Sequence, residues 1–131
     1  MKKNRPININ SERVEIDLEA SRYRIYVLGG FGVNLGQFII SFKHMATGEI
    51  TKCKKAFWPV HAYAFGMRAK RIFIVDIPIE GQYEVLFTNP KTLRVKYSNL
   101  PISSLFRKPL ATDQIEILIT EKLGVYPILK L

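Results

Sequence analysis

An alternation of apolar and polar residues with a period of two runs along most of this chain. It starts at Val14, Ile16 and Leu18, which are separated by charged residues. Successive side chains of a β-strand point to opposite faces, so this period predicts strands that bury one face. A chain with this period and no long helical pattern belongs to the all-β fold classes. The alternation returns in residues 22–28, 37–45, 81–87, 92–98 and 113–120.

The spacing of these strands predicts the architecture. About eight or nine short strands follow one another with a turn signal roughly every ten residues, which is typical of a sandwich or barrel. We expect an all-β, single-domain antiparallel β-sandwich of the immunoglobulin-like or jelly-roll type. Residues 71–77 are dense in β-branched and aromatic side chains. They should form a buried central strand.

Two local patterns add detail to this sandwich. Asn89-Pro90 is a strong turn signal between residues 81–87 and 92–98, so these two strands are expected to pair as a hairpin. Within residues 49–58 the apolar side chains change phase, which predicts a bulge or an edge strand. The lysines of this segment suit an edge strand, because charged side chains discourage pairing with another chain.

Length and composition indicate a single core. The chain has 131 residues, 47% of them hydrophobic, which suffices for one self-contained domain. We expect a flexible N-terminal segment at 1–12 and one β-sandwich domain at 13–131. The first residues lack the apolar run of a signal peptide, so the compartment stays open with the cytoplasm as the default expectation. No apolar stretch reaches the roughly 18 to 20 residues of a membrane span, so no transmembrane segment is expected.

The charge of the chain favours anionic partners. The formal net charge is +9 at neutral pH, and an excess of this size favours association with polyanions in general. The basic residues are unevenly distributed. Residues 43–71 hold seven of them against the single acid Glu49, and residues 91–108 hold five with no acid. The protein is therefore expected to present basic regions and not a uniformly charged surface.

The residues that usually carry chemistry do not form a recognisable constellation. Cys53 is the only cysteine, which excludes an internal disulfide, and we expect it to be a buried thiol. His44 and His61 have no neighbouring carboxylate and no metal-ligand spacing. The glycine-rich residues 29–36 lack the Lys-Ser/Thr of a phosphate-binding loop and precede a strand, so they are expected to form an interstrand loop. We therefore expect no enzyme activity, no cofactor and no metal site.

One segment combines aromatic and basic residues and is the candidate binding surface. If residues 60–66 form a strand, His61, Tyr63 and Phe65 share one face. These aromatics either fill the core or form a platform on which bases or sugar rings could stack. The candidate residues are Lys54, Lys55, Trp58, His61, Tyr63, Arg68, Lys70 and Arg71.

Three functions fit these observations. The first is a non-catalytic binding module in a protein assembly, formed with a protein partner or by self-association, in which the apolar residues 123–131 dock on the domain or on a partner. The second is a basic β-domain that binds nucleic acid or another polyanion through residues 52–71 and 91–108, with affinity that falls steeply as salt rises. The third is a small carbohydrate-binding module that uses Trp58 or Tyr63.

Overall fold

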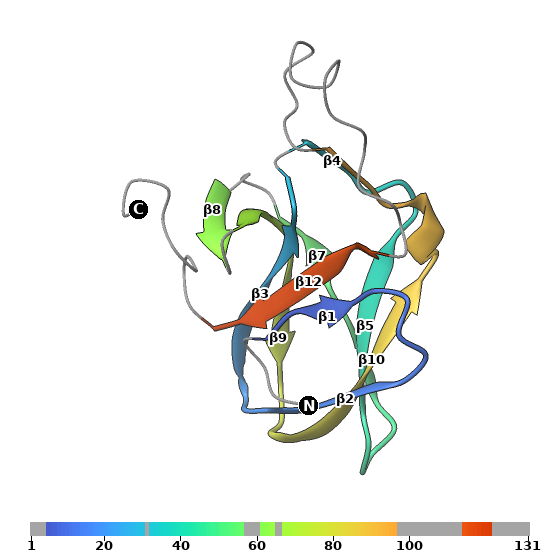
Figure 1. Ribbon diagram of the computed structural model, residues 1–131. Coiled ribbons are helices and arrows are strands. Elements are labelled where there is room, and N and C mark those ends of the chain that lie inside the picture. The colour runs from blue at the N-terminus through green and yellow to red at the C-terminus, as the bar shows by residue number, and fades with distance from the viewer. Residues whose placement is uncertain (1–4, 31, 57–60, 65–66, 97–113, 122–131) are drawn as a thin grey trace.

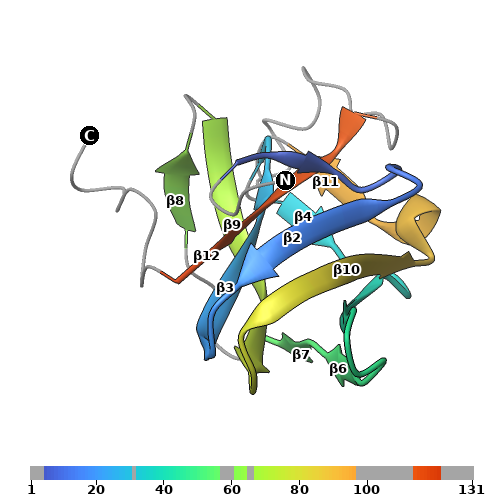
Figure 2. The same cartoon turned by 90° about the horizontal axis from the view of Figure 1, so that it is seen from below.

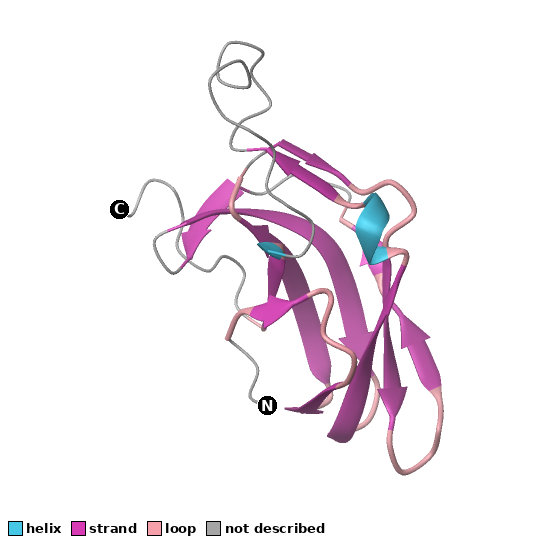
Figure 3. Cartoon of the chain, turned by 45° about the vertical axis from the view of Figure 1, so that its right-hand side comes forward, coloured by secondary structure: helices cyan, strands magenta, loops and turns pink. Residues whose placement is uncertain are grey.

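The computed structural model describes residues 5–30, 32–56, 61–64, 67–96 and 114–121. Nearly all of the regular secondary structure in this part of the chain is strand, and the helical turns in it are short (Figures 1 and 3). The strands form antiparallel sheets that pack against each other, which confirms the predicted all-β sandwich. Within the same residues, no helix has the length and apolar character needed to span a membrane.

The described residues contain twelve strands, more than the eight or nine expected. Residues 49–58 are divided into two strands, and short strands also form at residues 7–8 and within the glycine-rich residues 29–36, which were expected to be a loop. A six-stranded sheet has the order β1-β12-β3-β9-β7, and β8 also pairs with β9. A four-stranded sheet has the order β2-β10-β5-β6, and β11 and β4 form a two-stranded ribbon. The elements are β1 (Ile7–Asn8), β2 (Val14–Leu18), β3 (Ser21–Leu28), β4 (Gly32–Asn34), β5 (Ile39–His44), β6 (Ile50–Lys52), β7 (Lys54–Lys55), β8 (His61–Ala64), β9 (Met67–Ile77), β10 (Gly81–Thr88), the 3-10 turn η1 (Pro90–Thr92), β11 (Arg94–Lys96) and β12 (Glu116–Thr120).

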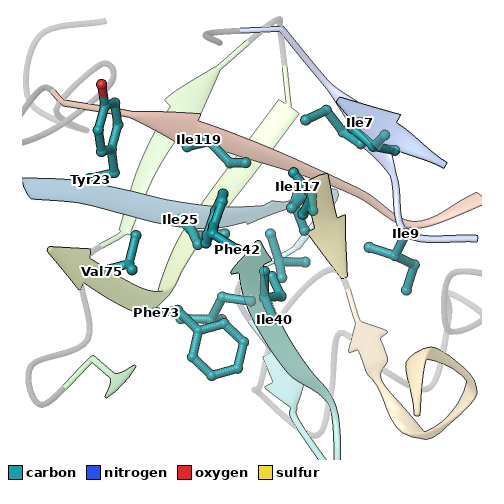
Figure 4. Close-up of a cluster of buried hydrophobic side chains, with 14 of the residues drawn as sticks. Ile7, Ile9, Tyr23, Ile25, Ile40, Phe42, Phe73, Val75, Ile117 and Ile119 are labelled. Carbon is teal, nitrogen blue, oxygen red and sulfur yellow. The ribbon is translucent and has the colours of Figure 1, made fainter. Parts of the chain in front are cut away.

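The core lies between the two larger sheets, where the apolar phases of their strands face each other (Figure 4). Ile25 of β3 and Ile117 of β12 come from the six-stranded sheet, and Phe42 of β5 comes from the four-stranded sheet. All three side chains are fully buried. The predicted inward phase of β12 is confirmed, because Ile115, Ile117 and Ile119 are all buried.

The phase change in residues 49–58 marks a crossing between the two sheets. β6 pairs with β5 in the four-stranded sheet, whereas β7 pairs with β9 in the six-stranded sheet. Cys53 lies between them, and its N–H donates to the carbonyl of Ile40 at 3.1 Å. Both short strands are at sheet edges, as the lysines predicted, and they follow each other around one side of the sandwich (Figure 2).

The predicted hairpin between β10 and β11 is wrong. β10 is paired on both sides, by β2 and β5, so it has no free edge for β11. Asn89 has a left-handed backbone conformation and precedes the η1 turn. After this turn, β11 pairs with β4, which lies within the glycine-rich segment. Asn89-Pro90 therefore does begin a turn, but the strand after it pairs with β4 and not with β10.

The N-terminal residues contribute to the core. Residues 1–12 were expected to be flexible, and 1–4 lie outside the described residues. In the remainder, β1 pairs with β12, and the side chains of Ile7 and Ile9 are both 1% exposed. The reason is a short alternation of isoleucine and asparagine at 7–10, which forms an edge strand with one apolar face. The folded domain therefore includes residues ahead of position 13.

Two tyrosines stabilise the turns that lead into β3 and β10 by hydrogen bonds between their hydroxyl groups and the backbone. The Tyr83 hydroxyl donates to the carbonyl of Ile79, four residues earlier in the chain. The Tyr23 hydroxyl accepts from the N–H of Glu19 at 2.9 Å and lies 3.3 Å from the carbonyl of the same residue. Both rings are buried, so each side chain fills the core and holds the corner beside it.

Candidate functional site

The structure places the predicted binding residues other than Trp58 on β7, β8 and β9, at one edge of the six-stranded sheet. β9 pairs with β7 through two register pairs, one of which joins Lys54 to Ile74, and with β8 through four. In these pairs His61 lies opposite Lys70, and Tyr63 lies opposite Arg68. Lys55 also belongs to β7, and Arg71 belongs to β9. Trp58 and Phe65 lie outside the described residues, as do the side chains of His61 and Tyr63, so the predicted stacking platform stays a prediction.

A β-bulge divides the basic residues of β9 between two faces. Ile25 of β3 pairs with Phe73, but the next residue, Tyr26, pairs with Arg71, so Ile72 is skipped. Residues opposite each other in an antiparallel pair point to the same face, and successive residues point to opposite faces. Arg71 therefore shares the face of Tyr26, while Lys70 points the other way. The predicted residues do not form one continuous surface.

The outer face of the six-stranded sheet is the face turned away from the core. On β3 it carries Arg22, Arg24 and Tyr26, which alternate with the buried residues of the same strand. Lys54 and Ile74 lie opposite each other on this face, and Ile74 pairs with Arg24 on its other side. Asp76 pairs with Arg22 in the same way. Together with Arg71 of β9, these residues give this face cations from three strands, β3, β7 and β9.

A groove of about 420 Å³ lies where the chain crosses from β6 to β7. It contains four cations and one carboxylate, and two apolar residues of β9 complete its wall. We call it the basic groove. Its lining residues are Arg22, Thr51, Lys52, Lys54, Lys55, Ile74, Val75 and Asp76.

The single carboxylate of the basic groove is already engaged. Asp76 Oδ1 lies 2.8 Å from Arg22 Nε, and its Oδ2 lies 3.3 Å from Arg22 Nη2. The hydrogen bond from Arg22 holds the pKa of the Asp76 carboxyl below its ordinary value, and the charges of Lys54 and Arg24 lower it further. Within the described part of the chain, no carboxylate forms an ion pair with the three lysines of the groove, so their charges remain available.

A second cationic feature, which we call the arginine cluster, consists of Arg24, Tyr26 and Arg71. Tyr26 is 0% exposed, and burial raises the pKa of its hydroxyl although Arg71 and Arg24 act to lower it. Arg71 hydrogen-bonds to the Tyr26 side chain. Arg24 donates from Nη1 to the carbonyl of Glu121 at 2.8 Å. Both guanidinium groups are thus placed beside one buried hydroxyl.

Sequence reasoning missed Arg22, Arg24 and Asp76. The two arginines belong to residues 12–24, where four acids and three bases nearly balance, so a count of charges along the chain did not separate them. The signal that could have found them was the alternation itself. It places Arg22 and Arg24 on the phase of the strand opposite to the buried Tyr23, Ile25 and Val27.

Cys53 packs against the core, and His44 is held by backbone groups. Burial raises the pKa of the Cys53 thiol well above its ordinary value, so the adjacent lysines do not activate it. His44 is buried, and its Nδ1 accepts from the N–H groups of Ala46 and Thr47 at 3.2 Å each. Its Nε2 therefore carries the hydrogen and donates to the carbonyl of Glu80. No described group of three acidic, histidine or cysteine side chains could hold a metal ion.

Comparison of the chain with protein-family models, with curated proteins and with solved structures finds no match.

Proposed function

We propose that this protein is a non-catalytic binding module that holds the phosphate backbone of a nucleic acid in the basic groove. The observation that carries the proposal is the gathering of Arg22, Lys52, Lys54 and Lys55 around one concave surface whose only carboxylate is paired. Three of these cations lie close together in residues 52–55, on β6 and β7, and the fold adds Arg22 of β3 to them. A phosphodiester chain matches this group of cations because it carries a regular series of negative charges.

The groove favours contact with phosphates over contact with bases. Its lining residues include no aromatic side chain on which a base could stack. Lysine binds phosphate as a point charge and does not read a base edge in a fixed geometry. Binding through this groove should therefore depend little on nucleotide sequence, and it should weaken as salt rises.

The test is a fluorescence-anisotropy titration of a labelled single-stranded oligonucleotide at low salt. The double variant Lys54→Gln/Lys55→Gln should bind several-fold more weakly than the unaltered protein. The matched control is Arg5→Gln/Arg13→Gln, which removes the same charge near β1 and β2, at the opposite edges of the two sheets. It should bind nearly as the unaltered protein does. Asp76→Asn should bind more tightly, because it removes the one negative charge in the groove.

Two outcomes would overturn this proposal. One is an absence of binding at low salt, and the other is an equal loss of affinity in the two double variants. A parallel titration with heparin separates phosphate from sulfate esters. If heparin binds through Lys54 and Lys55 while the oligonucleotide does not, the partner is a sulfated polysaccharide and not a nucleic acid.

The other two functions stay predictions. The carbohydrate-binding function depends on Trp58 and on the side chain of Tyr63, and the assembly function depends on residues 123–131. All of these lie outside the described residues. The basic groove is the only one of the three candidate interfaces that the described residues define in full.

A further inference from the structure

The arginine cluster on the outer face of the six-stranded sheet is a second feature, and it is built differently from the basic groove. Arg71 of β9 lies opposite Tyr26 of β3 in the register, and Arg24 lies on the same face two residues before Tyr26. Thr120 of β12 lies opposite Arg24 and is buried. Three neighbouring strands therefore converge on a small polar site in which two of the side chains are arginines.

The two guanidinium groups are incompletely satisfied by the residues around them. Arg24 Nε and Arg71 Nε have no exposed surface, and in the described structure neither has a hydrogen-bond acceptor. Buried N–H donors nearly always have a partner, and one left without an acceptor is costly when it carries charge. The nearby carboxylate of Asp76, which Arg24 influences, is already held by Arg22. The cluster therefore has donors and positive charge to offer to an acceptor.

We infer that the arginine cluster is a binding site for a single small oxyanion, with phosphate as its chemical type. A guanidinium offers its N–H donors in a planar fork that matches two oxygens of a phosphate, and two such forks can hold one tetrahedral group. The Tyr26 hydroxyl, to which Arg71 hydrogen-bonds, lies on the same face of the sheet as both arginines. The burial of these groups fits one compact anion, whereas the open basic groove fits a polymer. The inference does not depend on the proposed function, because no residue of the cluster lines the groove.

The test is a titration of the full chain with sodium phosphate, followed by NMR of the arginine Nε–Hε signals. The salt is balanced with sodium chloride to keep the ionic strength constant. The signals of Arg24 and Arg71 should shift and saturate together, while that of Arg22, which is on the same face but paired with Asp76, should barely move. Sulfate and a phosphate monoester are titrated separately to show which oxyanion is preferred.

Variants make the inference falsifiable even if the signals overlap. Phosphate should raise the Tm of the unaltered protein relative to chloride, because a ligand that binds only the folded state stabilises it. Arg71→Gln and Arg24→Gln should each lose that rise, and Arg22→Gln should keep it. A rise that persists in Arg71→Gln, or shifts that grow linearly without saturating, would overturn the inference. Lys54→Gln/Lys55→Gln should keep the phosphate response, so failure of the groove and failure of the cluster are distinguishable.

Discussion

Replacing Gly81 with alanine should disrupt the corner where the β9–β10 turn meets the β5–β6 turn. Gly81 has φ +150°, a conformation that residues with a side chain rarely adopt. A Cβ built at this position lies 2.6 Å from Nε2 of His44. His44 cannot move away freely, because it bonds to backbone groups of Ala46, Thr47 and Glu80. Its ring also packs edge-on against Tyr83, with the ring centroids 4.9 Å apart.

The magnitude follows from these contacts. The strained backbone contributes about 1 to 3 kcal/mol, and a displaced His44 loses hydrogen bonds whose net value is roughly 1 kcal/mol each. We therefore expect Gly81→Ala to lower the free energy of unfolding by about 3 to 5 kcal/mol. For a chain of this length that is a fall in Tm on the order of 10 to 20 °C. Gly48→Ala is the matched control. Its φ is +77° with nothing within 4 Å of the new Cβ, so it should lose only about 1 kcal/mol.

The assay is urea denaturation of the two glycine variants and of a double-mutant cycle with His44→Ala. In the His44→Ala background, only backbone strain should lower the stability of Gly81→Ala, because the contact with His44 is gone. The two positions should therefore show a coupling energy of about 1 to 3 kcal/mol. The reasoning is refuted if Gly81→Ala is no more destabilising than Gly48→Ala. It is also refuted if the loss is unchanged when His44 is absent.

Three further outcomes follow from the structure. Ile7→Ala should lower stability by about 2 to 5 kcal/mol in denaturant titrations because its side chain is in the core, and a negligible change would contradict that placement. Cys53 should resist alkylation in the native protein and react once urea unfolds it, because burial raises its pKa; rapid labelling of the native state would be the opposite result. At neutral pH the unaltered protein should have a higher free energy of unfolding than Asp76→Asn. This difference should disappear as pH falls through the lowered pKa of Asp76, since protonation ends its pairing with Arg22. Urea denaturation at neutral and at acidic pH measures it, and a difference that grows in acid would contradict this expectation.

The sequence predicted the strands of this fold better than their partners. Alternation identifies buried residues because it is a property of each strand alone, and Ile25, Phe42 and Ile117 are buried as that pattern requires. Pairing depends on which edges are free elsewhere in the chain. β10 was assigned to β11 by a valid turn signal, but β2 and β5 already occupy both of its edges. A local pattern carries no information about that competition.

The candidate site was predictable to a similar extent. Lys54 and Lys55 were recognised because a run of lysines at a phase change indicates an exposed edge. The contribution of Arg22 could not be recognised by counting charges along the chain, because it reaches the groove only through the pairing of β3 with β9. The position of Arg71 depends on the bulge at Ile72, which reverses the faces of the residues before it. No repeat or turn residue in the sequence marks that bulge.

The salt dependence of oligonucleotide binding measures how many phosphates the basic groove contacts. If its cations contact about three or four phosphates of a single strand, log Kobs should fall against log salt with a slope of about −2 to −3. Removal of two contacts in Lys54→Gln/Lys55→Gln should make the slope shallower by about 1.4. Binding in the basic groove should give both slopes. A slope near zero, or an unaltered slope in the double variant, would contradict it.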